Sequence, residues 1–468
     1  MARIYLIAPP CHNVYRQINS KNFGVLQPPL GLAYIGSFVK KHGHAVEIID
    51  TAFCKDLFGN IENGISGFKP DFVGISATTP QITSALEIAG YIKKRFPTIK
   101  TILGGYHASA LPEQSMADPN IDIVVCGEGE MTVAEILDGK DLNEIKGICF
   151  RRDGKIKINP PRPLIENLDF LPFPLWEQLP VRSYYFFSQR AIGVISGRGC
   201  PYRCSFCASS VINQYRCRMR SSANFVDEVE WLYKNYGINN LFFNDETFTL
   251  DIKRTEEICN LILDRRIRIK WTCDTRVDHL TKPILKIMRS AGCQCLRVGV
   301  ESADDKVLKE TGKGITLEQV ERVVSWAREL GIKTTAYYLL GLPYETLESL
   351  KRTLLFSRKL KTDLSYFMMH VPLPGTRTWE IAKEGRILRC VAKDWSEYTK
   401  HDKAIVESDN LSADQLTAYH DLMVKSYYFN PLYLSHKLFS IRSFRELREA
   451  FKAGATLFKM IFLKSKKN

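Results

Sequence analysis

The stretch Ala191-Ile-Gly-Val-Ile-Ser-Gly-Arg-Gly-Cys200-Pro-Tyr-Arg-Cys204-Ser-Phe-Cys207 decides the fold, because a short apolar run leads directly into three closely spaced cysteines. The apolar run predicts a strand, which places the cysteines on the tight loop that follows it. Thiolates are the usual ligands of iron–sulfur clusters. Three of them leave the fourth iron of a 4Fe-4S cluster open to an outside ligand. Zinc is the alternative, since Cys217 could supply a fourth thiolate, although structural zinc sites usually take two separated pairs.

The region downstream of this stretch alternates strands with helices. Strands are predicted at residues 191–196, 240–244, 269–274, 295–300, 333–340 and 364–370, separated by helical patterns such as 225–236 and 317–330. Six units in a row predict a partial (β/α)6 barrel, similar to a TIM barrel but incomplete, over residues 191–386. Active-site residues are then expected at the carboxyl ends of the strands.

The first 146 residues form a separate α/β pattern. Strands are predicted at residues 3–8, 45–50, 72–76, 101–103 and 121–126, with helices at 30–41 and 82–96. Such alternation predicts a doubly wound, Rossmann-like parallel sheet. Ligands of this architecture bind outside the carboxyl ends of the strands. The loops at those ends contain Ser76 and Thr78, Gly104 and Gly105, and Gly127 and Glu128.

Two further regions complete the predicted domain organisation. Residues 147–190 carry a hairpin signal at Asp153-Gly154 and then many prolines, which is typical of a linker between domains. Residues 387–468 lose the regular alternation and are predicted to be helical, aromatic and basic.

The composition narrows the class of protein. A chain of 468 residues with 45% hydrophobic residues can bury more than one core. The first ten residues do not resemble a secretory signal and no apolar run is long enough to span a membrane, so we expect a cytoplasmic protein. In that compartment 13 cysteines argue against a disulfide scaffold. The net charge is +14, and about half of it lies in residues 431–468.

The cysteine motif resembles a known superfamily. The spacing C-x3-C-x2-C, with Phe206 before the last cysteine, at the end of the first strand of a barrel, is similar to the radical S-adenosylmethionine (SAM) superfamily. The resemblance implies that Cys200, Cys204 and Cys207 hold a 4Fe-4S cluster whose open iron binds SAM. It also implies cleavage of SAM to a 5'-deoxyadenosyl radical, chemistry that the protein positions and shields.

Residues at later strand ends fit the same resemblance. Glu246 resembles the acidic residue that receives the SAM amino group, and Glu301-Ser302 resembles the ribose-binding acidic motif. Gly341 and Pro343 belong to a segment that resembles the one beside adenine. A single carboxylate at a strand end is equally compatible with a helix N-cap. The series of such positions behind three cysteines favours cofactor binding.

The N-terminal region has its own resemblance. Residues 27–33, 104–108 and 125–130 are similar to the cobalamin (B12)-binding domain that precedes some radical SAM domains. The D-x-H-x-x-G signature, whose histidine ligates cobalt in many corrinoid proteins, is absent, and we assign no metal role to His107. The alternative is a degenerate domain that only braces the barrel.

The two resemblances together imply hydrogen abstraction from an unactivated carbon followed by methyl transfer from methylcobalamin. Relatives of this architecture include the anaerobic Mg-protoporphyrin monomethyl ester cyclase and hopanoid-modifying enzymes, so cyclisation or rearrangement of a hydrophobic tetrapyrrole or lipid stays open. A corrinoid-binding sensor is a non-catalytic alternative. A tRNA methylthiotransferase would be expected to carry a further cysteine cluster, which this sequence lacks.

The expected partners are a small, hydrophobic substrate and a reducing protein such as flavodoxin or ferredoxin. In the basic tail, aromatic and basic residues recur at helical spacing: Phe444, Leu447, Phe451, Phe458 and Phe462 beside Arg445, Arg448, Lys452 and Lys459. This pattern predicts either peripheral contact with the inner face of the membrane or a helix packed on the barrel. Nucleic-acid binding ranks last, since no known module is present.

Overall fold

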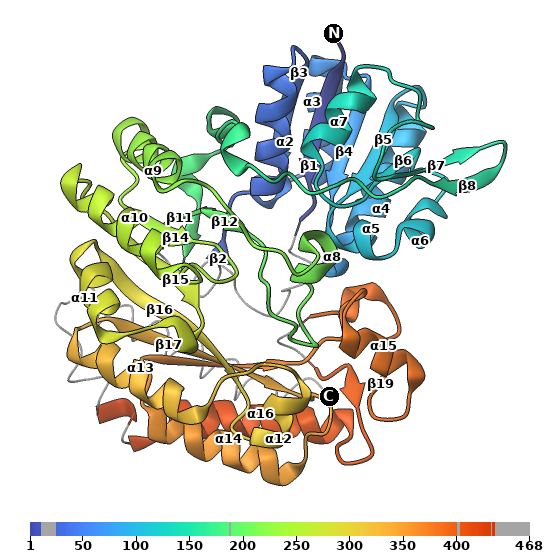
Figure 1. Cartoon of the computed structure of the whole chain (residues 1–468). Helices are drawn as coiled ribbons and strands as arrows, with labels where there is room; N and C mark the ends of the chain where they lie inside the picture. The colour runs from blue at the N-terminus through green and yellow to red at the C-terminus, as the bar shows by residue number, and fades with distance from the viewer. Residues whose placement is uncertain (11–24, 187–188, 400–402, 432, 436–468) are drawn as a thin grey trace.

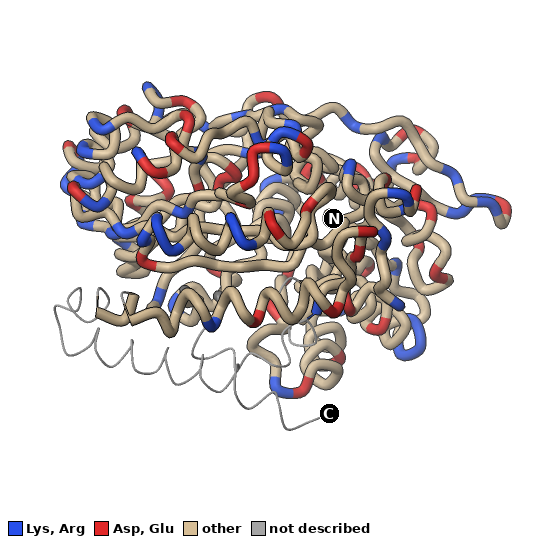
Figure 2. The backbone as a smooth tube through the Cα atoms, turned by 90° about the horizontal axis from the view of Figure 1, so that it is seen from below, with Lys and Arg blue, Asp and Glu red and all other residues tan. Residues whose placement is uncertain are grey.

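The computed structural model describes the chain except for residues 11–24, 187–188, 400–402, 432 and 436–468 (Figure 1). The basic tail therefore lies outside the described residues, and its predicted helical pattern with it. Within the described part no helix is long and apolar enough to cross a membrane. In the view of Figure 2, acidic and basic residues are intermixed along the described helices.

The N-terminal region folds into a seven-stranded sheet of order β3-β1-β4-β5-β6-β7-β8. The first five of these strands are parallel, as predicted: β3 (Ala45–Asp50), β1 (Arg3–Ala8), β4 (Phe72–Ser76), β5 (Lys100–Gly104) and β6 (Ile123–Val125). Helices cover both faces: α2 (Leu30–Lys41), α3 (Leu57–Phe68), α4 (Ile82–Arg95), α5 (Tyr106–Ala110), α6 (Pro112–Met116) and α7 (Glu130–Leu137).

Alternation along β1 explains the two layers of helices. Leu6 packs into a core with α2 and α7, whereas Ile7 packs into a second core with α3 and α4. Successive side chains of a strand point to opposite faces, so a strand that is apolar at every position is buried on both sides. The doubly wound arrangement follows from this pattern.

The hairpin expected in the linker instead extends the first sheet. Strands β7 (Ile148–Arg152) and β8 (Lys155–Ile158) add to it antiparallel, beyond β6. The rest of the proline-rich segment packs between the domains, with Trp176 fully buried and its Nε1 donating to Glu228 Oε1 at 2.9 Å. Tyr184 likewise donates through its hydroxyl to Asp50 Oδ2 at 2.9 Å.

The second region is a six-stranded, all-parallel sheet of order β11-β14-β15-β16-β17-β18, which confirms the partial barrel (Figure 1). Its strands are β11 (Ile192–Val194), β14 (Asn240–Phe243), β15 (Lys270–Thr275), β16 (Cys293–Glu301), β17 (Lys333–Leu340) and β18 (Leu364–Met369). Its helices are α9 (Ser222–Tyr236), α10 (Ile252–Asp264), α11 (Lys282–Ser290), α12 (Asp305–Glu310), α13 (Leu317–Glu329) and α14 (Leu347–Leu360). All these strand boundaries agree with the predicted ones to within two residues.

Short elements connect and close these two units. They are β2 (Val25–Leu26), β9 (Tyr185–Phe186), β10 (Gln189–Arg190), β12 (Gly197–Arg198), α8 (Ser209–Asn213), β13 (Arg218–Met219), α15 (Arg377–Glu384), β19 (Arg389–Cys390), β20 (Val406–Glu407) and α16 (Ala413–Tyr428). The predicted helical C-terminal region is represented by α16, which packs against α14 and β18.

Candidate functional site

The three motif cysteines lie on the loop between β12 and α8, at the carboxyl end of the barrel sheet. Two distant segments hold this loop at its centre. The amide of Ser205 donates to the Thr311 carbonyl at 2.9 Å, and its carbonyl accepts from the Thr378 amide at 3.0 Å. Cys200, Cys204 and Cys207 are each partly exposed as residues. The loop is therefore fixed without being fully buried.

Two of these thiols have raised pKa values. Burial raises the pKa of the Cys207 thiol to about 11. Burial also raises the pKa of Cys204, although the charges of Lys313 and Arg276 oppose the shift. Metal binding would convert the thiols to thiolates and release their protons. Among the described residues, no three His, Cys, Asp or Glu side chains are grouped closely enough to hold a single metal ion.

Glu246 lies beside the cysteine loop, directly after β14. Its Oε2 accepts from the Gly199 amide at 3.0 Å, and its Oε1 accepts from the Ser209 hydroxyl at 2.9 Å and from Asn213 Nδ2 at 3.3 Å. The residue is nevertheless exposed. An oriented, accessible carboxylate next to the cysteines fits the ammonium group of SAM.

Glu301 sits at the end of β16 in the left-handed region, with φ 66°. Its Oε1 accepts from Lys313 Nζ at 2.7 Å. A Cβ on Gly299 would lie 2.3 Å from that oxygen, so a larger residue there would displace the ion pair. Ser302 is fully buried behind this pair, and its hydroxyl lies 3.4 Å from Thr353 Oγ1. The structure thus places Glu301 near the cysteine loop and Ser302 in the interior.

The remaining predicted barrel residues lie at the same carboxyl edge of the sheet, after β17 or on the cysteine loop. Gly341 has φ 90°, and its amide donates to Glu345 Oε2 at 2.6 Å. Burial raises the pKa of Glu345 to about 8. Pro343 is buried one residue beyond Leu342. Phe206 packs, together with Met368, against a small buried cluster of Val307, Leu339 and Leu342.

The inner face of the barrel sheet carries aromatic side chains and the ion pair between Arg297 and Asp274. Alternate residues of β16 such as Leu296 and Val298 belong to the core under the helices, so Arg297 faces inward. Its Nε donates to the Tyr337 hydroxyl at 2.7 Å and lies 3.2 Å from Asp274 Oδ1. The ring of Tyr337 stacks on that of Tyr366, with centroids 5.3 Å apart.

The loops of the first sheet also have a defined geometry. Gly105 has φ 97°, and a Cβ there would lie 2.5 Å from the Ala77 carbonyl oxygen, so β4 and β5 end in close backbone contact. Ser76 and Gly104 are partly exposed beside it. The exposed Thr78 donates through its hydroxyl to Gln81 Oε1 at 2.8 Å and caps a short helix. At Gly127, with φ 82°, a Cβ would meet open space.

Tyr106 brings the first sheet to the cysteine loop. Burial raises the pKa of its hydroxyl, and the nearby charges of Glu246 and Cys207 raise it further. Its helix α5 packs against α8. His107, by contrast, points inward: its Nδ1 lies 3.3 Å from Thr79 Oγ1, and burial lowers its pKa to about 4.

Glu128, predicted as a corrinoid-binding residue, lies in an ion-pair cluster between the two regions. Its Oε1 pairs with Arg198 at 2.8 Å and its Oε2 with Arg218 at 2.7 Å. The Ile165 amide also donates to Oε2, at 2.8 Å. Arg198 reaches Glu130 Oε1 as well, at 2.6 Å. These charges join the first sheet to the segment that carries Cys200.

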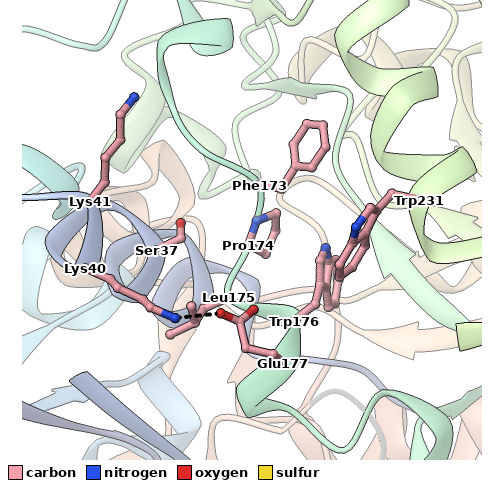
Figure 3. Close-up of a pocket in the computed structure, with 9 residues that line it drawn as sticks. All are labelled: Ser37, Lys40, Lys41, Phe173, Pro174, Leu175, Trp176, Glu177 and Trp231. Carbon is pink, nitrogen blue, oxygen red and sulfur yellow. Dashed lines mark hydrogen bonds and ion pairs between the residues drawn. The ribbon is translucent and has the colours of Figure 1, made fainter. Parts of the chain in front are cut away.

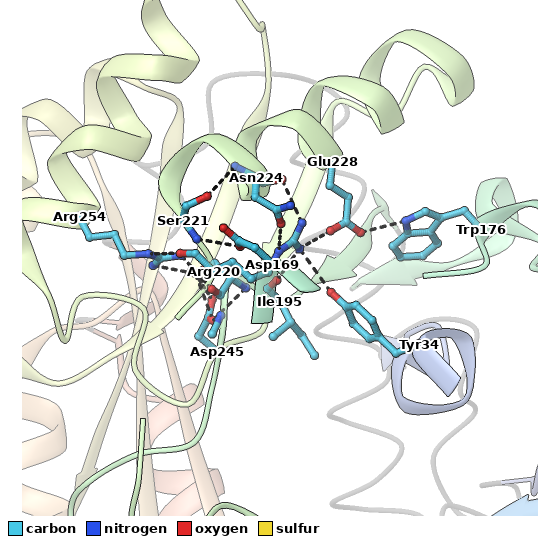
Figure 4. Close-up of polar contacts among 12 residues, drawn as sticks. Tyr34, Asp169, Trp176, Ile195, Arg220, Ser221, Asn224, Glu228, Asp245 and Arg254 are labelled. Atoms are coloured by element: carbon cyan, nitrogen blue, oxygen red, sulfur yellow. Dashed lines mark hydrogen bonds and ion pairs between the residues drawn. The ribbon is translucent and has the colours of Figure 1, made fainter. Parts of the chain in front are cut away.

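A second polar network braces the strand before the cysteines (Figure 4). The Ser196 amide donates to Asp245 Oδ1 at 3.0 Å, and Arg254 donates to the Ser196 carbonyl at 2.8 Å. Burial raises the pKa of Asp245 to about 7. Arg220, which receives Arg254 Nε on its carbonyl at 2.8 Å, pairs in turn with Glu228. The base of the cysteine loop is thereby fixed to α9 and α10.

Two concave pockets lie apart from these residues. One, of about 340 Å³, is lined by α2, the linker and Trp231, and is crossed by the Lys40–Glu177 ion pair at 3.0 Å (Figure 3). The other, of about 660 Å³, is lined by residues of α7 and the linker. Neither contains a residue predicted from the sequence to bind a cofactor.

Comparison with known proteins identifies both regions. Residues 194–357 match the model of the radical SAM superfamily, and residues 17–137 match that of the B12 binding domain. An uncharacterized methyltransferase of Pyrococcus horikoshii is 35% identical over 448 residues, which cover 94% of this chain and 96% of that protein. The chain belongs to the B12-binding group of the radical SAM superfamily. The predicted fold class and family are confirmed.

Other members of the superfamily agree. The anaerobic magnesium-protoporphyrin IX monomethyl ester cyclase of Rubrivivax gelatinosus is 31% identical over 362 residues, 74% of this chain and 65% of that enzyme. The structure of the radical SAM methyltransferase TsrM from Kitasatospora setae, with cobalamin and a [4Fe-4S] cluster bound, superposes with a TM-score of 0.72. It is 20% identical and covers 92% of this chain and 90% of that chain, which shows a shared fold. Membership in this group confirms the predicted set of cofactors: a 4Fe-4S cluster, SAM and cobalamin.

The sequence did not predict the residues that hold the carboxylates of the radical SAM site by hydrogen bonds or ion pairs. Ser209 and Asn213 come from a short helix with no motif of its own, and Lys313 follows α12 far along the chain. Arg198 lies two residues before Cys200, in the stretch that leads into the cysteine motif. A charged residue among the small residues of this loop is a signal from which its role could have been predicted.

Proposed function

We propose that the protein is a cobalamin-dependent radical SAM C-methyltransferase acting on a small, hydrophobic molecule. When bound, the cluster supplies the electron that cleaves SAM to a 5'-deoxyadenosyl radical, and cobalamin supplies the methyl group. The observation that carries the proposal is that α5, which follows β5 of the first sheet and begins at Tyr106, packs against α8, which follows the cysteine loop. A B12-binding edge and a SAM-binding edge therefore face the same space.

The residues divide the task between the two edges. Cys200, Cys204 and Cys207 would bind the cluster on a loop clamped at Ser205, and Glu246 would orient the SAM amino group. Glu301, with φ 66° and its partner Lys313, would receive the ribose. We infer supporting roles for Phe206, Ser302, Gly341 and Pro343 in shaping the nucleoside side of this site.

The corrinoid would lie over the loops of the first sheet. Ser76, Thr78, Gly104, Gly105 and Gly127 all stand at the carboxyl ends of its strands, where ligands of doubly wound sheets bind. The open space at Gly127 supports close approach of a bulky ring. Since His107 is buried against Thr79, it would not supply the lower ligand of cobalt.

The inner face of the barrel supports a hydrophobic substrate with one polar group. Phe242, Tyr337 and Tyr366 give it aromatic surface, and Arg297 lies over the Phe242 ring at 4.4 Å. The Asp274–Arg297 pair at its centre offers both a donor and an acceptor. Closing this space against water would protect the radical from side reactions.

Cyclisation or rearrangement without methyl transfer is the second candidate, favoured by the identity to the Rubrivivax cyclase. Labelled SAM distinguishes the two. The reconstituted, reduced holoenzyme is incubated with SAM carrying a 13C-methyl group, and the cobalamin is analysed by mass spectrometry. Label in cobalamin supports methyl transfer, whereas 5'-deoxyadenosine without label in cobalamin would favour the cyclase reaction. Absence of both products would overturn the enzyme assignment.

We also propose a reducing partner of the flavodoxin or ferredoxin type, because SAM cleavage consumes an electron. The basic, aromatic tail supports peripheral membrane contact, which would suit a hydrophobic substrate. Removing residues 431–468 should then weaken binding to anionic vesicles in a salt-sensitive way; unchanged binding would contradict this contact.

A further inference from the structure

A continuous series of hydrogen bonds joins the ion-pair cluster between the domains to the proposed SAM-binding carboxylate. Glu128 Oε2 pairs with Arg218 Nη1 at 2.7 Å, and Arg218 Nη2 donates to Asn213 Oδ1 at 2.9 Å. Asn213 Nδ2 in turn donates to Glu246 Oε1 at 3.3 Å. The series starts in the loop after β6 of the first sheet and ends beside Cys200.

These side chains are shielded from water and closely packed. As whole residues, Arg218 is 5% exposed, Asn213 4% and Glu128 9%. A Cβ on Gly199 would lie 2.6 Å from Asn213 Cβ, so the cysteine loop presses directly on this asparagine. Neither Arg218 nor Asn213 can exchange its partner for solvent without a rearrangement.

The order of donors and acceptors fixes the direction of the asparagine amide. A guanidinium has donors only, so the end of Asn213 that meets Arg218 must be its oxygen. The NH2 end is thereby turned toward Glu246, where it donates to the carboxylate. Glu128 holds Arg218 by a charge-assisted bond, and Arg218 also donates to the Ile165 carbonyl at 2.9 Å.

We propose that Arg218 and Asn213 are positioning residues for Glu246, and that Glu128 extends this role to the N-terminal domain. Docking of that domain would then be coupled to SAM affinity without any contact between Glu128 and SAM. The inference rests on the proposed function, in which Glu246 binds the SAM amino group. Equilibrium couplings of this kind are typically about 5–150-fold.

The test measures SAM affinity in full-length protein with a reconstituted cluster. SAM is titrated into the reduced protein, and the change in the electron paramagnetic resonance spectrum of the cluster gives the dissociation constant. We expect Asn213→Ala, which keeps the Cβ that contacts the cysteine loop, to weaken SAM binding about fivefold or more at unchanged iron content. Glu128→Gln should weaken it in the same direction, and the double variant should be no worse than Asn213→Ala alone, since both act on one series of bonds.

Arg216→Gln is the matched control. Arg216 lies two residues from Arg218 and pairs with Glu166 at 2.8 Å, but both side chains are more than half exposed, so its loss should leave SAM affinity unchanged. Wild-type affinity in Asn213→Ala, or additive effects of Glu128→Gln and Asn213→Ala, would overturn the inference and leave the proposed function standing. A wild-type spectrum that does not respond to SAM would overturn both.

Discussion

Replacing Arg198 by methionine tests the buried ion-pair cluster between the domains. The change removes one of the two cations of Glu128 and leaves Glu130 without its partner at 2.6 Å. The side chains are 15% exposed for Arg198, 5% for Glu128 and 4% for Glu130, so water cannot replace the lost contacts. Breaking a buried pair by removing one member typically costs about 3–5 kcal/mol.

The assay is urea unfolding of the full-length protein, followed by tryptophan fluorescence. The free energies of unfolding are compared between variants with a common slope against urea concentration. We expect a loss of about 3–5 kcal/mol for Arg198→Met, partly recovered in Arg198→Met/Glu130→Gln because the stranded carboxylate is then removed. The exposed pair lost in Arg216→Gln should cost at most about 1 kcal/mol. A loss below 1 kcal/mol for Arg198→Met, or no recovery in the double variant, would refute the reasoning.

Three further outcomes follow from the geometry. Gly299→Ala places a Cβ 2.3 Å from Glu301 Oε1, so SAM should bind more weakly in a calorimetric titration of the cluster-loaded protein, and unchanged affinity would remove Glu301 from the site. Gly105→Ala, with its Cβ 2.5 Å from a backbone oxygen at φ 97°, should lower the cobalt content while iron stays constant; equal loss of both metals would indicate general misfolding. Burial lowers the pKa of His107 to about 4, so the folded protein keeps its imidazole neutral at neutral pH. Its contribution to the free energy of unfolding is complete above pH 6.5 and is lost as the pH falls toward 4. His107→Gln should remove this pH dependence, which urea unfolding measured between pH 6.5 and 4 would show.

The sequence alone predicts the parts of the fold that follow from local periodicity. Buried parallel strands such as Phe72–Ser76 and Lys333–Leu340 are apolar runs between helical patterns, and their limits are found to the residue. The hairpin at Asp153-Gly154 was visible as a turn, but its pairing with β6 was not. That pairing depends on a distant edge, which no short stretch encodes.

The site divides in the same way. Residues at or shortly after the end of a strand, such as Glu301 and Glu246, are predictable because strand ends gather at one edge. Arg218 and Asn213 are not, since their importance comes from what they meet in space: a carboxylate ninety positions earlier in one case and one thirty-three positions later in the other. Glu128 was predicted from its loop to bind the corrinoid and that stays a prediction, whereas its ion pairs come from the docking of two domains.

The most direct test of the central claim is anaerobic purification with cobalamin, followed by iron, sulfide and cobalt analysis and an assay for 5'-deoxyadenosine after reduction. We predict a 4Fe-4S spectrum, near-stoichiometric cobalt and deoxyadenosine formation that disappears when Cys200, Cys204 and Cys207 are replaced by alanine. Zinc in place of iron, or deoxyadenosine formation that survives those replacements, would contradict the assignment of the cysteine loop.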